Sequence, residues 1–392
     1  MKRLWSVLSA IVLAAALAGC GGGGDGGGSD TGGGGSDGNG GEPGGSLVFT
    51  RIDYPGAYFT YVENVDESRR VSGWYLNSGD DKRYGFVKVG EDDAGYTSVN
   101  YSGAVSTYVR GFDASGRIFG DYETAGGAWH GFVQVGESFD SLVTVDCPEL
   151  GAIETEIIGI DASGKIFGNY KITGDVGLVR GFEKNGVGAA CVSIVYQGVS
   201  AEISGVDASG RVYGSYTPPQ FANLSGQPVE YAFVKDGGEY IDVAYPGAEQ
   251  TRIINIAASG PVFRIFGYYE TGNRQHGFVK EGKEKDKGYI PIDYPGAYDT
   301  YVLGVNSAGE FIGGYTTEYS PNAGDEEHMF VKTGKEEGKG YTSIDYQDPN
   351  VKVHETYLHN ITASGRIFCG TYYYGPAYDP ADPAHGFIAE YK

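Results

Sequence analysis

The sequence predicts an all-β protein, and three observations support this prediction. The chain of 392 residues contains 67 Gly and 32 Tyr but only 2 Met, and it has no long run of the Ala, Leu, Glu and Lys residues that favour helices. Apolar segments of strand length recur from residue 46 to residue 392, with Gly-containing turns between them. These segments repeat in a fixed order. We therefore expect one domain of strands and turns over 46–392.

One motif defines the repeating unit. It starts with Thr, has Asp or Asn six residues later and Gly three residues after that, and ends in a short apolar strand closing with Gly-x-Tyr. A period of roughly 50 residues that carries strand signals is typical of propeller blades. The sequence therefore predicts a seven-bladed β-propeller, with a stacked β-solenoid as the alternative. The seven copies start at Thr60, Thr107, Thr155, Ala201, Thr251, Thr300 and Thr356.

Each unit has room for four antiparallel strands. In the second copy we expect them at 107–112, 117–122, 130–135 and 141–147. Asp113 and Gly116 mark a tight turn between the first two, because Asp bonds to turn backbone and Gly accepts positive φ. The unit is thus a four-stranded blade.

The ends of the folded region indicate how the ring closes. Residues 47–54 resemble the fourth strand of a unit, and residues 385–391 resemble the third. The last unit therefore lacks its own outer strand. We expect the N-terminal strand to supply it, which removes the exposed edges that an open ring would have.

The N-terminus predicts an export signal and an anchor. Lys2 and Arg3 precede an apolar stretch too short for a stable membrane span, which ends in Leu17-Ala18-Gly19-Cys20. This ending resembles the lipobox of bacterial lipoproteins, which implies cleavage before Cys20 and lipidation of that residue. Residues 21–45 are rich in Gly and predict a disordered tether. We expect a protein anchored by lipid in the bacterial envelope, at the outer membrane or the cell surface.

The repeats also resemble a known family. Ile292-Asp293-Tyr294-Pro295-Gly296-Ala297, Asn306-Ser307-Ala308-Gly309 and His276-Gly277-Phe278 are similar to the bacterial extracellular repeats called HAF. The resemblance covers all seven units and implies a secreted repeat protein, without implying any catalytic residue. The chain departs from the pattern at Arg69, at 147–150, and at Ala201 and Ala232, so blades one, three and four are expected to be less regular.

Candidate ligand-binding residues gather on one predicted face, where third strands begin and fourth strands end. One repeat position there holds four of the six His, at His130, His276, His328 and His385. These imidazoles either face a ligand or bond to a neighbouring Thr or carboxylate within their own blade. Tyr58, Tyr298 and Asp299 follow fourth strands in the crossovers and are further candidates, although packing between blades also explains repeated Tyr.

We expect no metal and no cofactor. The acidic clusters at 80–81, 91–93 and 325–327 lack the spacing of an EF-hand loop, and equivalent His residues of successive blades are too far apart to share an ion. We also expect no disulfide between Cys147 and Cys191. An offset of four residues along neighbouring fourth strands would hold them about 13 Å apart, beyond the reach of a disulfide.

Composition limits the function classes. With 29 Lys and Arg against 51 Asp and Glu, the formal charge of −22 disfavours nucleic acid as a partner. We predict a monomeric, non-catalytic binding or adhesion module for a carbohydrate or protein ligand, held to the membrane through Cys20. The alternatives are a polysaccharide lyase or hydrolase, with His276 and Tyr269 or Tyr294 as the reacting pair, and a structural surface component.

Overall fold

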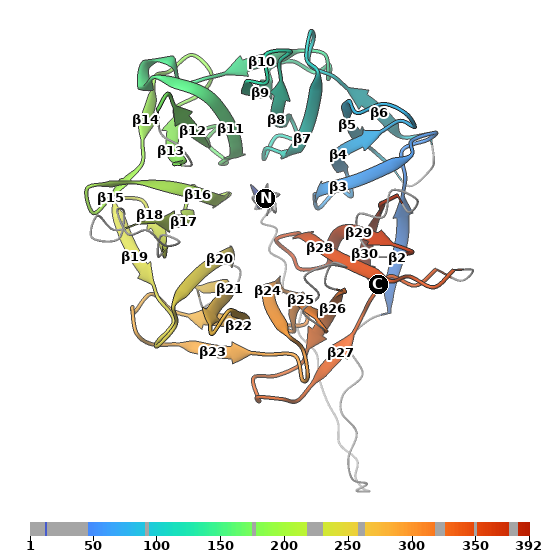
Figure 1. The fold of residues 1–392 in the computed structure, drawn as a ribbon, viewed down its shortest axis with the longest axis vertical. Helices are drawn as coiled ribbons and strands as arrows, with labels where there is room; N and C mark the ends of the chain where they lie inside the picture. The colour runs from blue at the N-terminus through green and yellow to red at the C-terminus, as the bar shows by residue number, and fades with distance from the viewer. Residues whose placement is uncertain are drawn as a thin grey trace, which may run out of the picture.

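The computed structural model describes residues 12–13, 46–90, 94–174, 178–217, 230–257, 263–317, 326–348, 351–375 and 383–392. In this part of the chain, seven antiparallel sheets stand around a common axis as the blades of a propeller (Figure 1). This confirms the predicted all-β fold and the number of blades. Among the described residues, no helix is long and apolar enough to cross a membrane.

The first three blades follow the repeat order. Each runs from an inner first strand to an outer fourth strand. Their strands are β3 (Phe59–Val65), β4 (Val71–Leu76), β5 (Arg83–Lys88) and β6 (Tyr96–Val99) in blade 1; β7 (Ser106–Phe112), β8 (Ile118–Glu123), β9 (Trp129–Gln134) and β10 (Leu142–Val145) in blade 2; and β11 (Ala152–Ile160), β12 (Ile166–Ile172), β13 (Arg180–Lys184) and β14 (Cys191–Ser193) in blade 3. A single 3₁₀ turn, η1 (Pro148–Leu150), lies between blades 2 and 3.

The remaining blades repeat this order with two additions. In blade 4, the short strands β1 (Val12–Leu13) and β15 (Val195–Tyr196) also pair with the first strand. The other strands are β16 (Val199–Asp207), β17 (Val212–Tyr216), β18 (Tyr231–Asp236) and β19 (Glu239–Val243) in blade 4; β20 (Gln250–Ala257), β21 (Arg264–Thr271), β22 (Arg274–Glu281) and β23 (Tyr289–Ile292) in blade 5; β24 (Asp299–Val305), β25 (Phe311–Thr316), β26 (Glu327–Lys332) and β27 (Tyr341–Ser343) in blade 6; and β28 (Glu355–Ile361), β29 (Ile367–Tyr373), β30 (His385–Tyr391) and β2 (Leu47–Ile52) in blade 7.

The ring closes as the sequence predicts. Strand β2, from the start of the folded region, pairs antiparallel with β30 along its whole length, from Leu47 opposite Tyr391 to Ile52 opposite Gly386. In Figure 1, the blue β2 therefore lies beside the red strands of blade 7. The first strand of every blade contacts the first strands of both neighbouring blades. The N-terminal and C-terminal segments thus complete one blade between them.

A Phe that recurs in the third strands, preceded by Gly in most blades, packs the blades together. The Phe side chains at this position are completely buried in all seven blades: Phe86, Phe132, Phe182, Phe233, Phe278, Phe330 and Phe387. In five blades the preceding residue is Gly, whereas blades 4 and 6 have Ala232 and Met329 there. The Gly leaves room for the first strand of the next blade. A Cβ atom on Gly131 would lie 2.6 Å from Ile157 Cγ1, so a larger residue there would push blades 2 and 3 apart.

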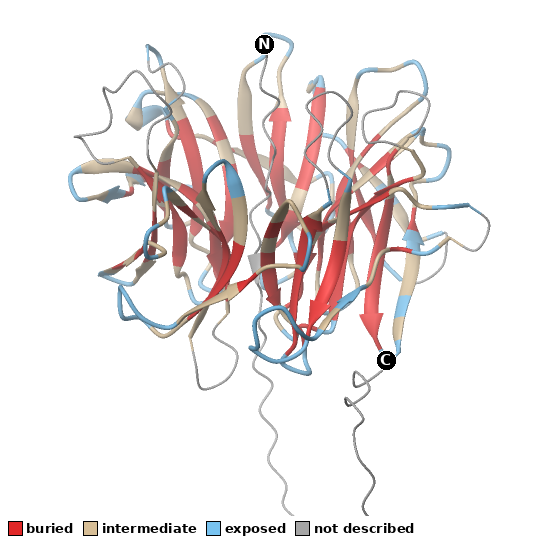
Figure 2. Cartoon of the chain, turned by 60° about the horizontal axis from the view of Figure 1, so that its bottom comes forward, coloured by how far each residue is buried: buried red, intermediate tan, exposed pale blue. Residues whose placement is uncertain are grey.

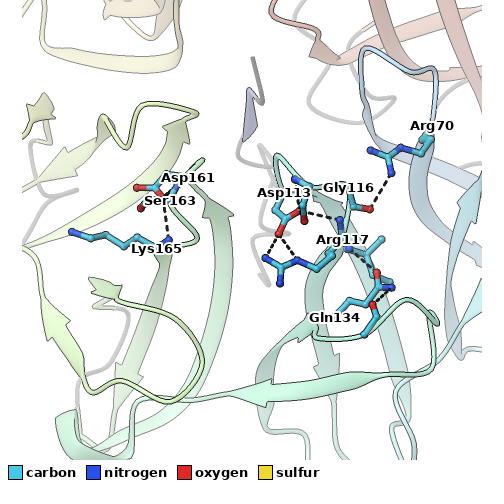
Figure 3. A network of polar contacts seen from close by, with 11 residues as sticks. Arg70, Asp113, Gly116, Arg117, Gln134, Asp161, Ser163 and Lys165 are labelled. Carbon is cyan, nitrogen blue, oxygen red and sulfur yellow. Dashed lines mark hydrogen bonds and ion pairs between the residues drawn. The ribbon is translucent and has the colours of Figure 1, made fainter. Parts of the chain in front are cut away.

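The turns between first and second strands are fixed by Asp residues in blades 1 to 4. The Asp113 carboxylate accepts hydrogen bonds from the backbone N–H groups of Ser115 and Arg117, both 2.9 Å long, and Asp161 holds its turn in the same way (Figure 3). Arg70 of blade 1 donates to the Gly116 carbonyl at 3.0 Å and so links two turns. Arg69, which stands where other copies have Gly, still adopts a positive φ of 61°. The departures in blades 1, 3 and 4 therefore leave four-stranded blades intact.

The recurring Thr anchors the crossovers. The hydroxyl group of Thr251 accepts the backbone N–H of Tyr245 at 2.9 Å, and Thr60, Thr107 and Thr300 accept the equivalent N–H groups. We expect Thr251→Val to lower the free energy of unfolding by about 1–2 kcal/mol, because the Tyr245 N–H loses its acceptor. Urea denaturation measures this effect. Thr251→Ser keeps the hydroxyl group and should lose less, and equal losses would contradict this role.

The expectation of no Cys147–Cys191 bond is wrong. The two residues form a disulfide, with Cα atoms 5.6 Å apart. The prediction counted an offset along two aligned strands, but Cys147 lies beyond the end of β10, in a crossover that turns through η1 and contacts β14. The Glu149 carboxylate accepts the backbone N–H of Cys191 there. Cys369 is a buried free thiol.

Candidate ligand-binding face

The predicted face exists and is formed by strand ends. Because each blade is antiparallel, first and third strands begin on the face where second and fourth strands end. We call this the crossover face, because it carries the connections between blades. The carboxyl terminus follows the end of β30 and marks the opposite face, at the lower edge of Figure 2. Buried residues fill the middle of the strands between the two faces (Figure 2).

The four candidate His residues occupy equivalent places on the crossover face. Each imidazole Nδ1 bonds to an Asp at the end of the fourth strand of its own blade: His130 to Asp146 at 2.9 Å, His276 to Asp293 at 3.2 Å, His328 to Asp345 at 3.0 Å and His385 to Asp53 at 3.1 Å. Each ring also packs against a Tyr of the second strand, with centroids 5.1 to 5.3 Å apart. The same arrangement in four blades indicates a structural role for the imidazole.

A second Tyr extends each stack into the neighbouring blade. Tyr245, in the crossover from blade 4, lies 3.6 Å from Tyr269 at an angle of 6°, and Tyr269 lies 5.1 Å from His276. Burial raises the pKa of Tyr269, so this phenol keeps its proton and is a poor base. The hypothesis of a reacting pair also included Tyr294. That residue stacks on Tyr315 of blade 6 at 3.7 Å, so it belongs to the equivalent stack of the next blade.

The other three candidates lie in two separate crossovers. Tyr58 lies between blades 7 and 1, with 38% of its surface exposed. Tyr298 and Asp299 lie between blades 5 and 6 and hold the start of β22. The Arg274 guanidinium lies 5.1 Å from the Tyr298 ring centroid, and Asp299 Oδ1 accepts the Gln275 N–H at 2.7 Å. The structure therefore does not bring these seven residues into one site, and their role in ligand binding stays a prediction. Cys20 lies outside the described residues.

Sequence reasoning missed a cluster of aromatic side chains at the inner ends of blades 1 and 2. Phe59, Tyr61, Trp74, Tyr108 and Trp129 form this cluster, which we call the tryptophan surface. All but Tyr108 are half-buried. The rings of Phe59 and Tyr61 each lie 5.1 Å from that of Trp74, and Tyr108 lies 5.2 Å from Trp129. Trp74 and Trp129 are the only Trp residues outside the predicted signal peptide.

Charged groups border the tryptophan surface. The Arg83 guanidinium lies 5.4 Å from the Trp74 ring centroid and 5.9 Å from that of Tyr108. Arg110 bonds to Glu63 at 3.0 Å and to Asp121 at 2.9 Å, and so joins blades 1 and 2. The Glu63 carboxylate also accepts the Trp74 indole N–H at 3.1 Å. Half-buried aromatic rings beside fixed hydrogen-bonding groups suit a ligand that has both apolar and hydroxylated sides.

A signal for this surface was present in the repeats. The residue directly after the recurring Thr is polar or aromatic in every copy, and the residue after that is always aliphatic. The polar or aromatic residues at the first of these positions are Tyr61, Tyr108, Glu156, Glu202, Arg252, Tyr301 and Tyr357. The aliphatic residue packs on the neighbouring blade, as Ile157 does on Gly131. Its alternating neighbour lies on the other side of the first strand. Comparing the residues at this repeat position between the seven copies would have shown where aromatic side chains gather.

Blades 3 and 4 carry an acidic residue at the same repeat position, Glu156 and Glu202. Burial, and next the nearby Glu230 carboxylate, raise the pKa of Glu202 to about 7. Because this pKa is higher than in the unfolded chain, the folded state binds the extra proton between about pH 4.5 and pH 7. The stabilisation is therefore complete below that window and is lost as the pH rises through 7.

We accordingly expect Glu202→Gln to flatten the pH dependence of stability. The wild-type free energy of unfolding should fall by about 2–3 kcal/mol more than that of the variant between pH 5 and pH 8. Denaturant titrations at both pH values measure the difference. Glu239→Gln, at an exposed position, controls for the removed charge. Parallel pH profiles for wild type and Glu202→Gln would show that Glu202 does not retain the proton.

Comparison with known proteins supports the fold alone. No family model matches the chain, and no curated protein sequence matches it. A structure from a study of two prolyl endopeptidases is similar with a TM-score of 0.53 and 12% identity, over 84% of this chain and 50% of that one. This chain thus spans half the length of that protein.

Two further structures are more distant. An ulvan lyase of polysaccharide lyase family PL25 has a TM-score of 0.38 and 11% identity, over 74% of this chain and 78% of that one. An Aleuria aurantia lectin solved with a fucosylated sugar has a TM-score of 0.36 and 12% identity, over 73% of this chain and 95% of that one. TM-scores this low give no information about the activity of this chain. The similarity to HAF repeats stays a prediction from the sequence.

Proposed function

We propose that this chain is a lipid-anchored extracellular propeller that binds a neutral glycan at the tryptophan surface and does not transform it. The observation that carries the proposal is the placement of both Trp residues of the folded region, together with Tyr61 and Tyr108, on one part of the crossover face. The C–H faces of sugar rings stack on such aromatic groups. The hydroxyl groups of sugars bond to guanidinium groups like that of Arg83, which borders this surface.

The charge of the chain favours a neutral ligand. The formal charge is −22, and it would repel sulfated or uronate-rich polymers over long distances. Catalysis is not part of the proposal, because the His and Tyr pair suggested for a lyase occurs in four blades with the same internal contacts. The lipidated Cys20 and the tether at 21–45 would hold the domain away from the membrane surface.

A glycan array of neutral oligosaccharides tests the proposal. We expect the purified chain to retain at least one glycan, and we expect Trp74→Ala with Trp129→Ala to weaken its binding by about ten-fold or more. Emission from the two Trp residues should change on binding to the wild-type chain.

The matched control is Phe263→Ala. Phe263 is also a half-buried aromatic residue beside a guanidinium group, that of Arg211 at 5.1 Å, but it adjoins the turn on the opposite face. Its substitution should leave glycan binding unchanged. Retention of no glycan by the wild type, or equal retention by the double Trp variant, would refute the proposal.

A further inference from the structure

One repeat position forms a ring of side chains around the propeller axis. It is the position directly after the recurring Thr, and it lies in the first strands, which are the innermost strands of the blades (Figure 1). We call these residues the axial ring: Tyr61, Tyr108, Glu156, Glu202, Arg252, Tyr301 and Tyr357. Burial and the Glu327 carboxylate raise the pKa of Tyr301, and Tyr61 also raises it although blade 7 lies between these two residues. The members of the ring are therefore close enough to influence one another.

The axial ring has an aromatic half and a charged half. Blades 6, 7, 1 and 2 contribute its four Tyr residues, and two of these, Tyr61 and Tyr108, belong to the tryptophan surface. Blades 3, 4 and 5 contribute its three charged residues. Arg110 connects the halves, because its guanidinium group lies 5.3 Å from the Tyr108 ring centroid and its Nη2 lies 3.5 Å from Glu156 Oε1. The charged half is thus continuous with the tryptophan surface.

The middle residue of the charged half, Glu202, has a carboxyl group without a partner. Within the described part of the chain it makes no hydrogen bond and no ion pair. The residue is half-buried, and its oxygen atoms are not among the polar atoms that are closed off from solvent. Burial raises the pKa of Glu202 to about 7, so near neutral pH many molecules carry a protonated carboxyl group, which both donates and accepts. A hydroxyl group of a ligand would supply the missing hydrogen bonds.

The two other charged members lie on either side of Glu202 in the ring. The side chain of Glu156 is 39% exposed, and its contact with Arg110 is long. The side chain of Arg252 is 41% exposed, and its Nη2 pairs with the Glu230 carboxylate at 2.7 Å. This ion pair fixes the guanidinium group before a ligand arrives, which lowers the entropic cost of binding. The charged half therefore presents an acceptor on one side of Glu202 and a donor on the other.

This mixture of groups favours hydroxyl groups over ions. Glu156 and Glu202 disfavour an anion, and the guanidinium group of Arg252 disfavours an ammonium group beside it. Among the residues that the structure describes, no three His, Cys, Asp or Glu side chains are grouped to hold a metal ion. A hydroxyl group can donate to a carboxylate and accept from a guanidinium group. Because blade 3 lies between Glu202 and the tryptophan surface, a ligand that contacts both has to be extended, as a linear oligosaccharide is.

We propose that the charged half of the axial ring is a second subsite of the glycan site, for the hydroxyl groups of a linear neutral oligosaccharide whose other end stacks on the tryptophan surface. Glu156, Glu202 and Arg252 are its direct contacts. This inference rests on the function proposed above, and it adds the form of the ligand and the residues that select it.

Isothermal titration calorimetry with cellohexaose, mannohexaose and maltohexaose tests the subsite. We expect at least one hexasaccharide to bind the wild-type chain, and we expect Glu202→Ala and Glu156→Ala each to weaken its binding by about five-fold or more. The exposed side chain of Glu156 keeps the test valid if Glu202→Ala does not fold. The matched control is Glu239→Ala, at an exposed Glu where β19 begins on the opposite face, and it should bind like the wild type. Trp74→Ala with Trp129→Ala should weaken binding of the same hexasaccharide, because both halves hold one ligand.

Three outcomes would overturn the inference, and they separate it from the proposed function. If the double Trp variant loses the hexasaccharide while both Glu variants bind it as tightly as the wild type, the glycan site has no second subsite. If no hexasaccharide binds but the array identifies another neutral glycan, the proposed function stands and the linear ligand is wrong. If the wild type binds no glycan in either experiment, both proposals are wrong.

Discussion

Deleting residues 46–54 is expected to open the ring and lower the melting temperature by more than about 10 °C, or to cause aggregation. These residues include β2, which supplies the outer strand of blade 7. Without it, the outer edge of β30 has no strand partner. Phe49 would also be lost, and its ring packs against Tyr346 at 5.6 Å and Phe387 at 5.7 Å. Differential scanning calorimetry at a fixed scan rate measures the change.

Two controls separate ring closure from simple truncation. Deletion of 21–44 removes only predicted tether and should leave the melting temperature unchanged. Within β2, Phe49→Ala should be clearly destabilising and Val48→Ala nearly neutral, because Val48 is an exposed neighbour on the alternate side of the strand. Equal melting temperatures for the two deletions would mean that β2 does not close the ring.

Removing the disulfide should have the second large effect. Cys147→Ala with Cys191→Ala is expected to lower the free energy of unfolding by about 3–4 kcal/mol, because the bond closes a loop with a sequence separation of 44 residues. Denaturant unfolding of the oxidised wild type and the double variant measures this loss. Cys369→Ala keeps the bond and serves as a cysteine control. If the double variant unfolds with the wild type, the two thiols do not pair in solution.

The sequence was sufficient for the architecture because each repeat carries its own folding signals. Asp113 fixes a turn, Thr107 anchors a crossover and Gly131 allows close packing, and all three recur at one spacing. Ring closure could also be predicted from residue order, since the strand at the start of the folded region resembles the fourth strand of a repeat. Departures such as Arg69 were tolerated because the neighbouring backbone imposes the turn conformation.

The site was harder to predict, because binding surfaces depend on how blades meet. The recurring His residues were conspicuous, but their regularity reflects the His–Asp–Tyr stack within each blade. Trp74 lies in a different repeat from Tyr108 and Trp129, and only the packing of blades 1 and 2 brings it near Tyr108. The disulfide was missed for the same reason. Counting residues along strands gave no information about the path of the crossover that contains Cys147.

Hydrogen exchange measured by mass spectrometry, with a glycan from the array bound, tests the central claim most directly. The claim is that the tryptophan surface of the crossover face binds the ligand. We predict slower exchange in peptides that contain the start of β3, the end of β4 and the start of β7, and unchanged exchange in the turns at 66–70 and 113–117 on the opposite face. Slower exchange confined to those turns, or absent from both faces at saturating glycan, would contradict the account.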